Sequence, residues 1–130
     1  MILLDTDVCI EILRGNRQVI DKRLEGDDRV AVSFMTVGEL YYGAEKSKNR
    51  SRNKHVVDEF ILSIDVINTD MDILKRFGEI KAGLNLKGNP LADADILIAA
   101  TCLSKCDKLV TGNSKHFEKI ENLTIENWIR

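Results

Sequence analysis

Acidic and amide side chains recur in this sequence where a short apolar run ends or where a helical pattern begins. These positions are Asp5, Glu39, Asp93, Asp95 and Asn113. Carboxylates that converge repel one another, and burying them is unfavourable unless a cation compensates their charge. Their oxygen atoms are the ligands that Mg²⁺ or Mn²⁺ prefers in proteins. If the fold brings these positions together, we expect a site for such a cation, which in phosphoryl chemistry binds phosphate and activates a water molecule.

Zinc is a poorer candidate, because its sulfur and nitrogen ligands are scattered along the chain. Only Cys102 and Cys106 have the i, i+4 spacing that places two thiols on one face of a helix. We expect these two small side chains to pack in the core of the protein instead.

Each acidic residue also has a purely structural interpretation. Thr36 and Glu39 have the spacing of a capping box, in which Glu39 returns a hydrogen bond to the backbone of Thr36. Asp5 and Asp93 fit the N-cap positions of helices. Asp95 fits this explanation less well, because it lies in the first turn of a helix whose next five residues are all apolar. We therefore expect Asp93 to cap this helix and Asp95 to face the site.

Short apolar runs alternate with longer stretches of helical periodicity along the chain. The expected strands are 2–4, 29–34, 64–67, 108–111 and 123–125, and the expected helices cover 8–13, 17–24, 36 onward, 56–61, 71–86 and 93–103. This alternation predicts a single doubly wound α/β domain over residues 1–130, with a mostly parallel central sheet flanked by helices. Ligands of such sheets bind beyond the carboxyl ends of the strands, where most of the acidic positions fall.

The composition is that of a globular protein. Of the 130 residues, 44% are hydrophobic and 31% are charged, and the net charge of -2 lacks the basic excess of proteins that hold nucleic acid by electrostatics alone. The longest apolar runs are too short for a membrane span, and Met1 leads into no basic segment. The three cysteines form no CxxC pair, which favours reduced thiols, a cytoplasmic location and no membrane association.

Four segments resemble, in order and spacing, the successive motifs of PIN-domain ribonucleases, and most closely those of the VapC toxins of bacterial and archaeal toxin–antitoxin pairs. They are 3–8, 36–44, 95–100 and 109–117, and the resemblance extends from Leu3 to Trp128. It implies an endoribonuclease in which Asp5, Glu39 and Asp95 form an acidic pocket that holds Mg²⁺ or Mn²⁺. A metal-bound water would then attack an RNA phosphodiester in line and leave a 5′-phosphate and a 3′-hydroxyl.

The resemblance also bears on the last of the four motifs and on partners. The family often has a fourth acidic residue at the position of Asn113, whose amide can ligate a metal through its carbonyl oxygen but carries no charge. A second metal ion is therefore not implied. Thr111, in the same motif, is a candidate to contact the substrate. The expected partners are a small cognate antitoxin that blocks the acidic pocket and a second copy of the chain in a homodimer.

A basic run follows the Glu39 helix and alternates with serine and asparagine. It contains Lys46, Lys48, Arg50, Arg52 and Lys54. A solvated loop or helix start explains this pattern by itself. If the run lies at the rim of the acidic pocket, its cations, with Lys46 and Arg50 as candidates, would contact RNA phosphates. No aromatic residue interleaves with the run, so base stacking by this segment is not expected.

Two other functions fit parts of the pattern. Residues 2–8 also resemble the first motif of haloacid-dehalogenase-type phosphatases, in which Asp5 would be the nucleophile and Asp7 a second carboxylate. That family needs a lysine and then a metal-binding acidic pair, and the acids after Thr111 do not follow a strand in that pattern. The third possibility is a non-catalytic PIN-like module that binds RNA or protein, and the three pocket carboxylates weigh against it.

Overall fold

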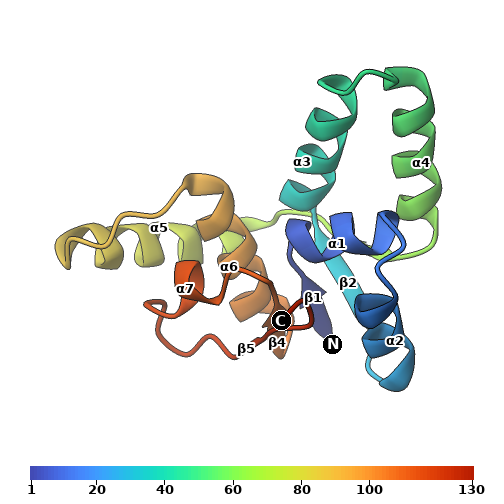
Figure 1. The fold of residues 1–130 in the computed structure, drawn as a ribbon. Coiled ribbons are helices and arrows are strands. Elements are labelled where there is room, and N and C mark those ends of the chain that lie inside the picture. Colours follow the sequence, from blue (N-terminus) through green and yellow to red (C-terminus); the bar gives the residue numbers. More distant parts are fainter.

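The computed structural model describes all of residues 1–130. Five strands and seven helices alternate along the chain (Figure 1). The strands are β1 (Ile2–Leu4), β2 (Val30–Ser33), β3 (Asp65–Ile67), β4 (Lys108–Val110) and β5 (Ile125–Glu126). The helices are α1 (Thr6–Leu13), α2 (Arg17–Glu25), α3 (Phe34–Glu45), α4 (Arg50–Leu62), α5 (Met71–Leu86), α6 (Asp93–Lys105) and α7 (Ser114–Phe117). No helix combines the length and the apolar composition that a bilayer crossing requires.

The sheet is wholly parallel, with the strand order β3-β2-β1-β4-β5. Strand β1 is central. Strands β2 and β3 extend the sheet on one side of β1, and strands β4 and β5, which come later in the sequence, extend it on the other side. This topology confirms the predicted doubly wound α/β fold. Its switch point lies between β1 and β4, and the carboxyl ends of these two strands are the place where such folds bind ligands.

Side chains of the central strands alternate between two apolar clusters. Ile2 and Leu4 belong to the cluster that packs against α1, α2, α3 and α4, whereas Leu3 belongs to the cluster that packs against α5, α6 and α7. The alternation follows from the two-residue repeat of an extended strand. Figure 1 shows the corresponding groups of helices on opposite sides of the sheet. Because both faces are covered, β1 is apolar at every position.

Helix α6 has more buried residues than any other helix. Six of its residues between Ile96 and Cys102 are buried, and the polar one among them, Thr101, donates its hydroxyl to the Leu97 carbonyl at 2.7 Å. Cys102 packs in the core as predicted, whereas Cys106 is only half-buried, and all three cysteines are free thiols. This tightly packed helix gives a rigid support to the acidic residues at its first turn.

Helix α3 begins two residues earlier than the sequence pattern indicates, and this makes the capping-box interpretation wrong. Ser33, at the end of β2, is the N-cap, and its hydroxyl accepts a hydrogen bond from the Thr36 backbone N–H at 3.2 Å. Thr36 is therefore already inside the helix, and its N–H is satisfied without Glu39. The Glu39 side chain is free to contact residues outside α3.

Asp93 does not cap α6, which corrects a second prediction. The N-cap residue is Ala92, whose side chain makes no capping hydrogen bond, and Asp93 is the first helical residue. Its carboxylate instead accepts a hydrogen bond from Lys81 Nζ on the neighbouring helix α5 at 2.9 Å. Helix α6 therefore begins without a side-chain cap. The negative charge of Asp93 still interacts favourably with the positive end of the helix dipole.

Several further boundaries differ from the sequence pattern. Helix α4 begins at Arg50, because Asn49 is its N-cap and accepts a hydrogen bond from the Arg52 backbone N–H at 3.4 Å. The second half of the basic run is thus helical. Strand β5 begins at Ile125 rather than Leu123 and has only two residues, both paired with β4.

The capping assignments predict different effects of two aspartate substitutions. Asp70 caps α5 by accepting a hydrogen bond from the Ile73 N–H at 2.9 Å, and it also pairs with Lys105. We expect Asp70→Ala to lower the free energy of unfolding by about 1 to 2 kcal/mol. Asp93→Ala removes an exposed ion pair and a favourable charge at the start of α6, but no side-chain cap, and should lower the free energy of unfolding by about 0.5 kcal/mol. Urea denaturation measures both, and a larger loss for Asp93→Ala would contradict the assignments.

Candidate active site

The pairing of β1 with β4 brings Asp5 and Thr111 together at the carboxyl end of the sheet. Leu4 pairs with Val110, and the backbone N–H of Asp5 donates to the Val110 carbonyl at 2.8 Å. The hydroxyl of Thr111, a fully buried residue, donates to Asp5 Oδ2 at 2.8 Å. Two strand ends that are more than a hundred residues apart in the sequence therefore share one hydrogen-bonded site.

Asp5 is both a helix cap and the most buried carboxylate of the site. Its Oδ1 accepts a hydrogen bond from the Thr6 N–H at 2.8 Å at the start of α1, and the residue is only 5% exposed. Burial raises the pKa of Asp5 to about 7, and the negative charges of Asp7 and Asp95 add to the shift. The hydrogen bonds from Thr111 and Thr6 oppose this rise in pKa without reversing it. A nearby cation would therefore stabilise the ionised form of Asp5.

Glu39 reaches the site from α3 through Thr6. The Thr6 hydroxyl donates to Glu39 Oε1 at 2.7 Å and lies 3.0 Å from the hydroxyl of Thr36. Because the backbone N–H of Thr6 also binds Asp5, one threonine links the carboxylates of Asp5 and Glu39. The first turn of α1 thus fixes both side chains relative to each other.

Asp95 joins the cluster from the first turn of α6. Its negative charge contributes to the raised pKa of Asp5, and its Oδ2 lies 3.5 Å from Nδ1 of His116 in α7. Asp93, two residues earlier, is exposed and points to Lys81 instead. The structure therefore links Asp5 to Glu39 through Thr6 and places Asp95 near enough for its charge to raise the pKa of Asp5, whereas Asp93 pairs with Lys81.

Asn113 and Thr111 differ in their exposure to solvent. Asn113 is exposed, and its side chain makes no capping hydrogen bond to α7, so its carbonyl oxygen is open to a ligand. The hydroxyl of Thr111 is buried and engaged twice, since it donates to Asp5 and accepts a hydrogen bond from the Asn113 N–H at 3.0 Å. This position does not favour the expected contact of Thr111 with substrate. The hydroxyl orients Asp5 instead.

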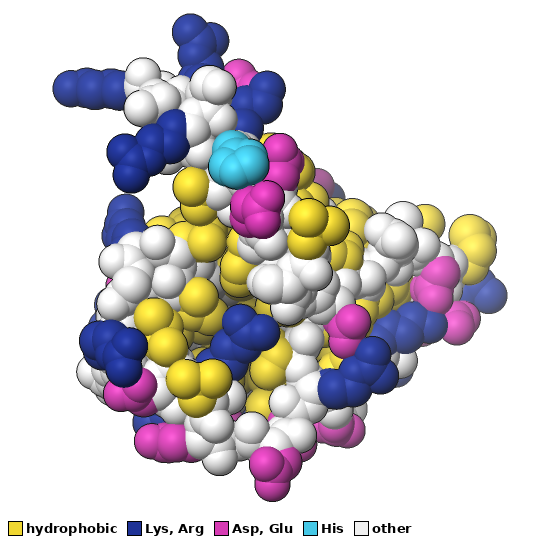
Figure 2. All heavy atoms as spheres, turned by 90° about the vertical axis from the view of Figure 1, so that its right-hand side faces the viewer, with side chains coloured by type: hydrophobic (Ala, Val, Ile, Leu, Met, Phe, Trp, Pro, Cys, Tyr) yellow, Lys and Arg dark blue, Asp and Glu magenta, His cyan; other side chains and the backbone are white.

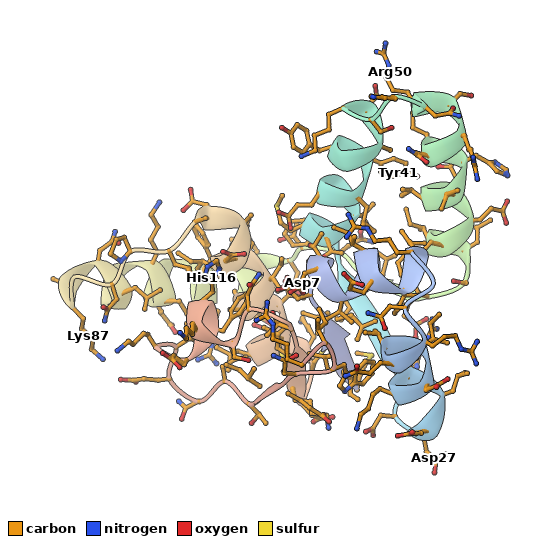
Figure 3. All side chains as sticks on the ribbon, viewed as in Figure 1. Asp7, Asp27, Tyr41, Arg50, Lys87 and His116 are labelled. Atoms are coloured by element: carbon orange, nitrogen blue, oxygen red, sulfur yellow. The ribbon has the colours of Figure 1, made fainter.

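Lys46 and Arg50 do not lie at the rim of the acidic group. They lie at the tip of the α3–α4 hairpin, where Lys46 ends α3 and Arg50 begins α4. Lys46 is two helical turns beyond Glu39, roughly 10 Å along the axis of α3. Figure 3 shows Arg50 pointing away from the molecule at this tip, and Figure 2 shows Lys and Arg side chains around the same projection. The two cations therefore lie at an exposed tip beyond the acidic group.

The hairpin tip carries an aromatic side chain that the linear pattern of the basic run does not indicate. Tyr42 lies one helical turn before Lys46, its residue is 67% exposed, and Lys46 Nζ lies 4.9 Å from the centre of its ring. The i, i+4 spacing of a helix accounts for this contact. An exposed ring beside cations offers a surface on which a base can stack. The structure thus supplies a stacking surface that the sequence does not.

Four residues beside the carboxylates have no role in the nuclease site that the sequence predicts. They are Thr6, Asp7, His116 and Arg130. Asp7, at the start of α1 (Figure 3), accepts a hydrogen bond from the Gly112 N–H at 2.9 Å, and its Oδ1 is buried without a hydrogen-bond partner. Burial raises the pKa of Asp7, while Gly112 and Arg130 oppose this rise. Thr6 and Asp7 could have been found from the sequence, because they are within two residues of Asp5. Nothing in the sequence indicates that Arg130 lies near the site.

The side chains of the site fit a hard cation. The donors are carboxylate or amide oxygens, but no three Asp, Glu, His or Cys side chains converge closely enough to hold a metal ion by themselves. Mg²⁺ usually keeps several waters and needs only one or two carboxylates, so an open arrangement suits it. The unpartnered buried Oδ1 of Asp7 and the raised pKa of Asp5 mark an excess of buried negative charge that a cation would relieve.

Comparison with known proteins identifies the class to which this fold and site belong. The model of the PIN domain family matches residues 2–123. The chain is 34% identical to "Ribonuclease VapC2" of Haemophilus influenzae, over 98% of this chain and 97% of that protein. It is 36% identical to the "tRNA(fMet)-specific endonuclease VapC" of Salmonella typhimurium, over 97% of this chain and 96% of that protein. The chain therefore belongs to the PIN domain family, and within it to the VapC group.

Solved structures of VapC proteins have the same fold over their full length. The DNA-bound VapBC complex from Salmonella typhimurium contains a chain that matches with a TM-score of 0.91 and 34% identity, covering 98% of this chain and 97% of that one. VapBC-1 from nontypeable Haemophilus influenzae matches with a TM-score of 0.89 and 28% identity, and both chains are fully covered. The match includes every strand end that contributes to the acidic group.

Family membership favours the nuclease over the phosphatase alternative. The oxygen atoms of Asp5 accept hydrogen bonds from Thr6 and Thr111, and the residues that hold Asp5 include no lysine. A haloacid-dehalogenase-type phosphatase requires a lysine for its active site. The threonine contacts instead suit a carboxylate that is held in one orientation.

The raised pKa of Asp5 predicts a pH-dependent gain in stability for Asp5→Asn in metal-free buffer. Well below about pH 4 the carboxyl group is protonated in both the folded and the unfolded protein, and its burial imposes no charge penalty on stability. The penalty grows as the pH rises toward about 7, the folded-state pKa, and is complete above it. Asparagine keeps the cap and avoids this penalty. We expect Asp5→Asn to raise the free energy of unfolding at pH 8 by about 4 kcal/mol more than at pH 4.

Urea denaturation in EDTA at several pH values measures this difference. Asp27→Asn is the matched control, because Asp27 is exposed at the far end of α2 (Figure 3). Its effect should stay within about 0.5 kcal/mol at every pH. A gain for Asp5→Asn that does not change with pH would contradict the burial of an uncompensated carboxylate at position 5.

Proposed function

We propose that this protein is an Mg²⁺- or Mn²⁺-dependent endoribonuclease and the toxin of a toxin–antitoxin pair. Asp5, Glu39 and Asp95 bind the cation, and Asn113 is a neutral fourth ligand. The observation that carries the proposal is the buried carboxylate of Asp5 at the carboxyl end of β1, which has a pKa of about 7, is linked through Thr6 to Glu39 and feels the charge of Asp95. Relatives named as ribonucleases and as a transfer RNA endonuclease support RNA as the substrate.

The residues of this chain orient the ligands before the substrate binds. Thr111 and Thr6 each hold one oxygen of Asp5, so its remaining lone pairs keep a fixed direction. Thr6 also holds Glu39, and His116 lies beside Asp95. A bound divalent cation supplies charge neutralisation for the carboxylates and the RNA phosphate, and it supplies an activated water for hydrolysis. Rigid ligands reduce the reorganisation that the reaction requires.

The comparisons also support specific partners. A relative from Salmonella typhimurium is named as specific for tRNA(fMet), so the initiator transfer RNA is the first substrate to test. Solved relatives include toxin–antitoxin complexes, which supports a cognate antitoxin that covers the acidic group of this chain. We also propose that residues 1–130 form a single nuclease domain and that the protein acts as a homodimer. The three free thiols favour a reducing compartment, and we propose that the protein is located in the cytoplasm.

The metal site predicts that Asp95→Asn abolishes cleavage without unfolding the protein. The substitution keeps the shape of the side chain but removes a negative ligand, so we expect the rate of cleavage to fall at least about 100-fold. Loss of one charge beside Asp5 relieves repulsion, and the free energy of unfolding should not decrease by more than about 0.5 kcal/mol. Cleavage of initiator transfer RNA in Mn²⁺, followed on denaturing gels, measures the rate, and urea denaturation measures the stability.

Asp93→Asn is the matched control, since Asp93 lies two residues away on the same helix but outside the acidic group. It should cleave RNA at the wild-type rate. EDTA should stop the wild-type reaction, and excess Mn²⁺ should restore it. Cleavage that continues in EDTA, or an active Asp95→Asn with an inactive Asp93→Asn, would refute the proposed ligand set.

The hairpin tip predicts a salt-dependent contribution to RNA affinity from Lys46 and Arg50. The two cations are exposed and lie beyond the acidic group, so they suit phosphate contacts away from the cleaved bond. The double variant Lys46→Ala/Arg50→Ala should raise KM about 3- to 10-fold and leave kcat unchanged. The slope of log KM against log salt should fall by about 0.7 for each phosphate contact that is lost.

A double variant of equal charge in α2, Arg17→Ala/Lys22→Ala, is the control for net charge. Both of its residues are exposed, and α2 lies away from the hairpin tip (Figure 1). It should leave the salt slope unchanged. Equal changes in the two double variants would mean that net charge rather than the hairpin tip contributes to binding.

A further inference from the structure

The backbone of Gly112 is held from two sides by charged side chains. Its N–H donates to Asp7 Oδ2 at 2.9 Å, and its carbonyl accepts a hydrogen bond from Arg130 Nη1 at 3.1 Å. Asp7 comes from the first turn of α1, and Arg130 is the last residue of the sequence. Both backbone groups of one loop residue are thus occupied by side chains from remote parts of the chain. We call Asp7, Gly112 and Arg130 the loop clamp.

The clamp leaves no room for a side chain on Gly112. A Cβ atom at this position would lie 2.6 Å from Ile129 Cδ1 and 2.7 Å from Asp7 Oδ2. Both distances are shorter than real Cβ atoms show, so one of the two side chains would have to move. Glycine fits here because the side chains of Ile129 and Asp7 approach its backbone closely, and not because of its backbone angles.

Arg130 is anchored independently of the acidic group. The Asn127 side chain accepts hydrogen bonds from the backbone N–H groups of Ile129 at 2.8 Å and Arg130 at 3.0 Å. Trp128 is buried in the core, and its carbonyl accepts a hydrogen bond from Gln18 Nε2 at 3.3 Å. The segment that carries Arg130 is therefore fixed by the core and by α2, and it can act as a support for the loop.

The clamped residue sits between two residues of the acidic site. Thr111 precedes Gly112 and orients Asp5, whereas Asn113 follows it and is the neutral ligand in the proposed function. A rotation of the Gly112 peptide would move both neighbours at once. We propose that Asp7 and Arg130 are positioning residues, which hold the Gly112 backbone so that Thr111 and Asn113 keep their places beside Asp5. This inference rests on the proposed nuclease function.

The role of Asp7 in the clamp needs a hydrogen-bond acceptor and not a charge. One of its oxygens binds Gly112, and the other is buried without a partner, so the second oxygen adds negative charge beside Asp5 without a compensating bond. Asparagine can accept the same hydrogen bond through Oδ1. Alanine cannot. The comparison of Asp7→Ala with Asp7→Asn therefore separates the clamp from the effect of charge, because both variants remove the charge and only one removes the acceptor.

The test measures RNA cleavage and amide exchange in the full-length chain. We expect Asp7→Ala to lower kcat about 10- to 100-fold with little change in KM, and Asp7→Asn to restore kcat to within about threefold of the wild type. Arg130→Ala should lower kcat in the same way, and Arg130→Lys, which keeps a donor, should recover most of it. Hydrogen exchange of the Gly112 and Asn113 amides, followed by NMR in metal-free buffer, should speed up at least about tenfold in both alanine variants.

Two results would contradict the proposal that Asp7 and Arg130 position the Gly112 backbone. Equal loss of kcat in Asp7→Ala and Asp7→Asn would show that charge, and not the hydrogen bond, is what matters. Unchanged exchange of the Gly112 amide in Asp7→Ala would show that the loop does not depend on Asp7. The exchange experiment needs no activity, so a wild-type protein that fails to cleave RNA would refute the proposed function and leave the clamp to be judged by the exchange rates alone.

Discussion

The structure depends on one electrostatic constraint, which is the burial of Asp5 beside other carboxylates. Asp5 follows the central strand directly, where it caps α1 and contacts Thr111 at the end of the neighbouring strand. Its hydrogen bonds do not offset its burial and the charges of Asp7 and Asp95, so its pKa rises to about 7. An isolated fold would gain stability from an uncharged side chain at this position. The presence of a carboxylate at position 5 is explained if a bound cation compensates its negative charge during function.

Two threonines, through their hydroxyl groups and one backbone N–H, hold these charged side chains in an ordered site. Thr6 connects Asp5 to Glu39, and Thr111 connects Asp5 to the loop that ends in Asn113. These neutral donors fix the carboxylates without neutralising them, whereas a lysine or arginine in the same places would remove the need for a metal ion. The arrangement therefore preserves both the geometry and the negative charge that a divalent cation requires.

The fold was predictable because strand and helix patterns are local, and the site was predictable only in part. Asp5 and Asp95 stand out beside apolar runs, and parallel strands bring such ends together. Thr36 and Asp93 were assigned wrongly as caps, because Ser33 at the strand end and Lys81 on another helix compete for their roles. Two contacts could not be predicted from the linear pattern of residue types. The hydrogen bond of Arg130 to Gly112 depends on tertiary packing. The contact of Lys46 with the ring of Tyr42 depends on helix geometry.

The central claim is that a divalent cation compensates the buried charge of Asp5. Calorimetric titration with Mn²⁺ at pH 6.5, in two buffers with different ionisation enthalpies, tests it most directly because it counts protons released on binding. With a pKa of about 7 for Asp5, we predict that each bound ion releases about 0.8 proton at pH 6.5 and almost none at pH 8.5. Binding with no proton release at pH 6.5, or no binding of Mn²⁺ at either pH, would contradict the account.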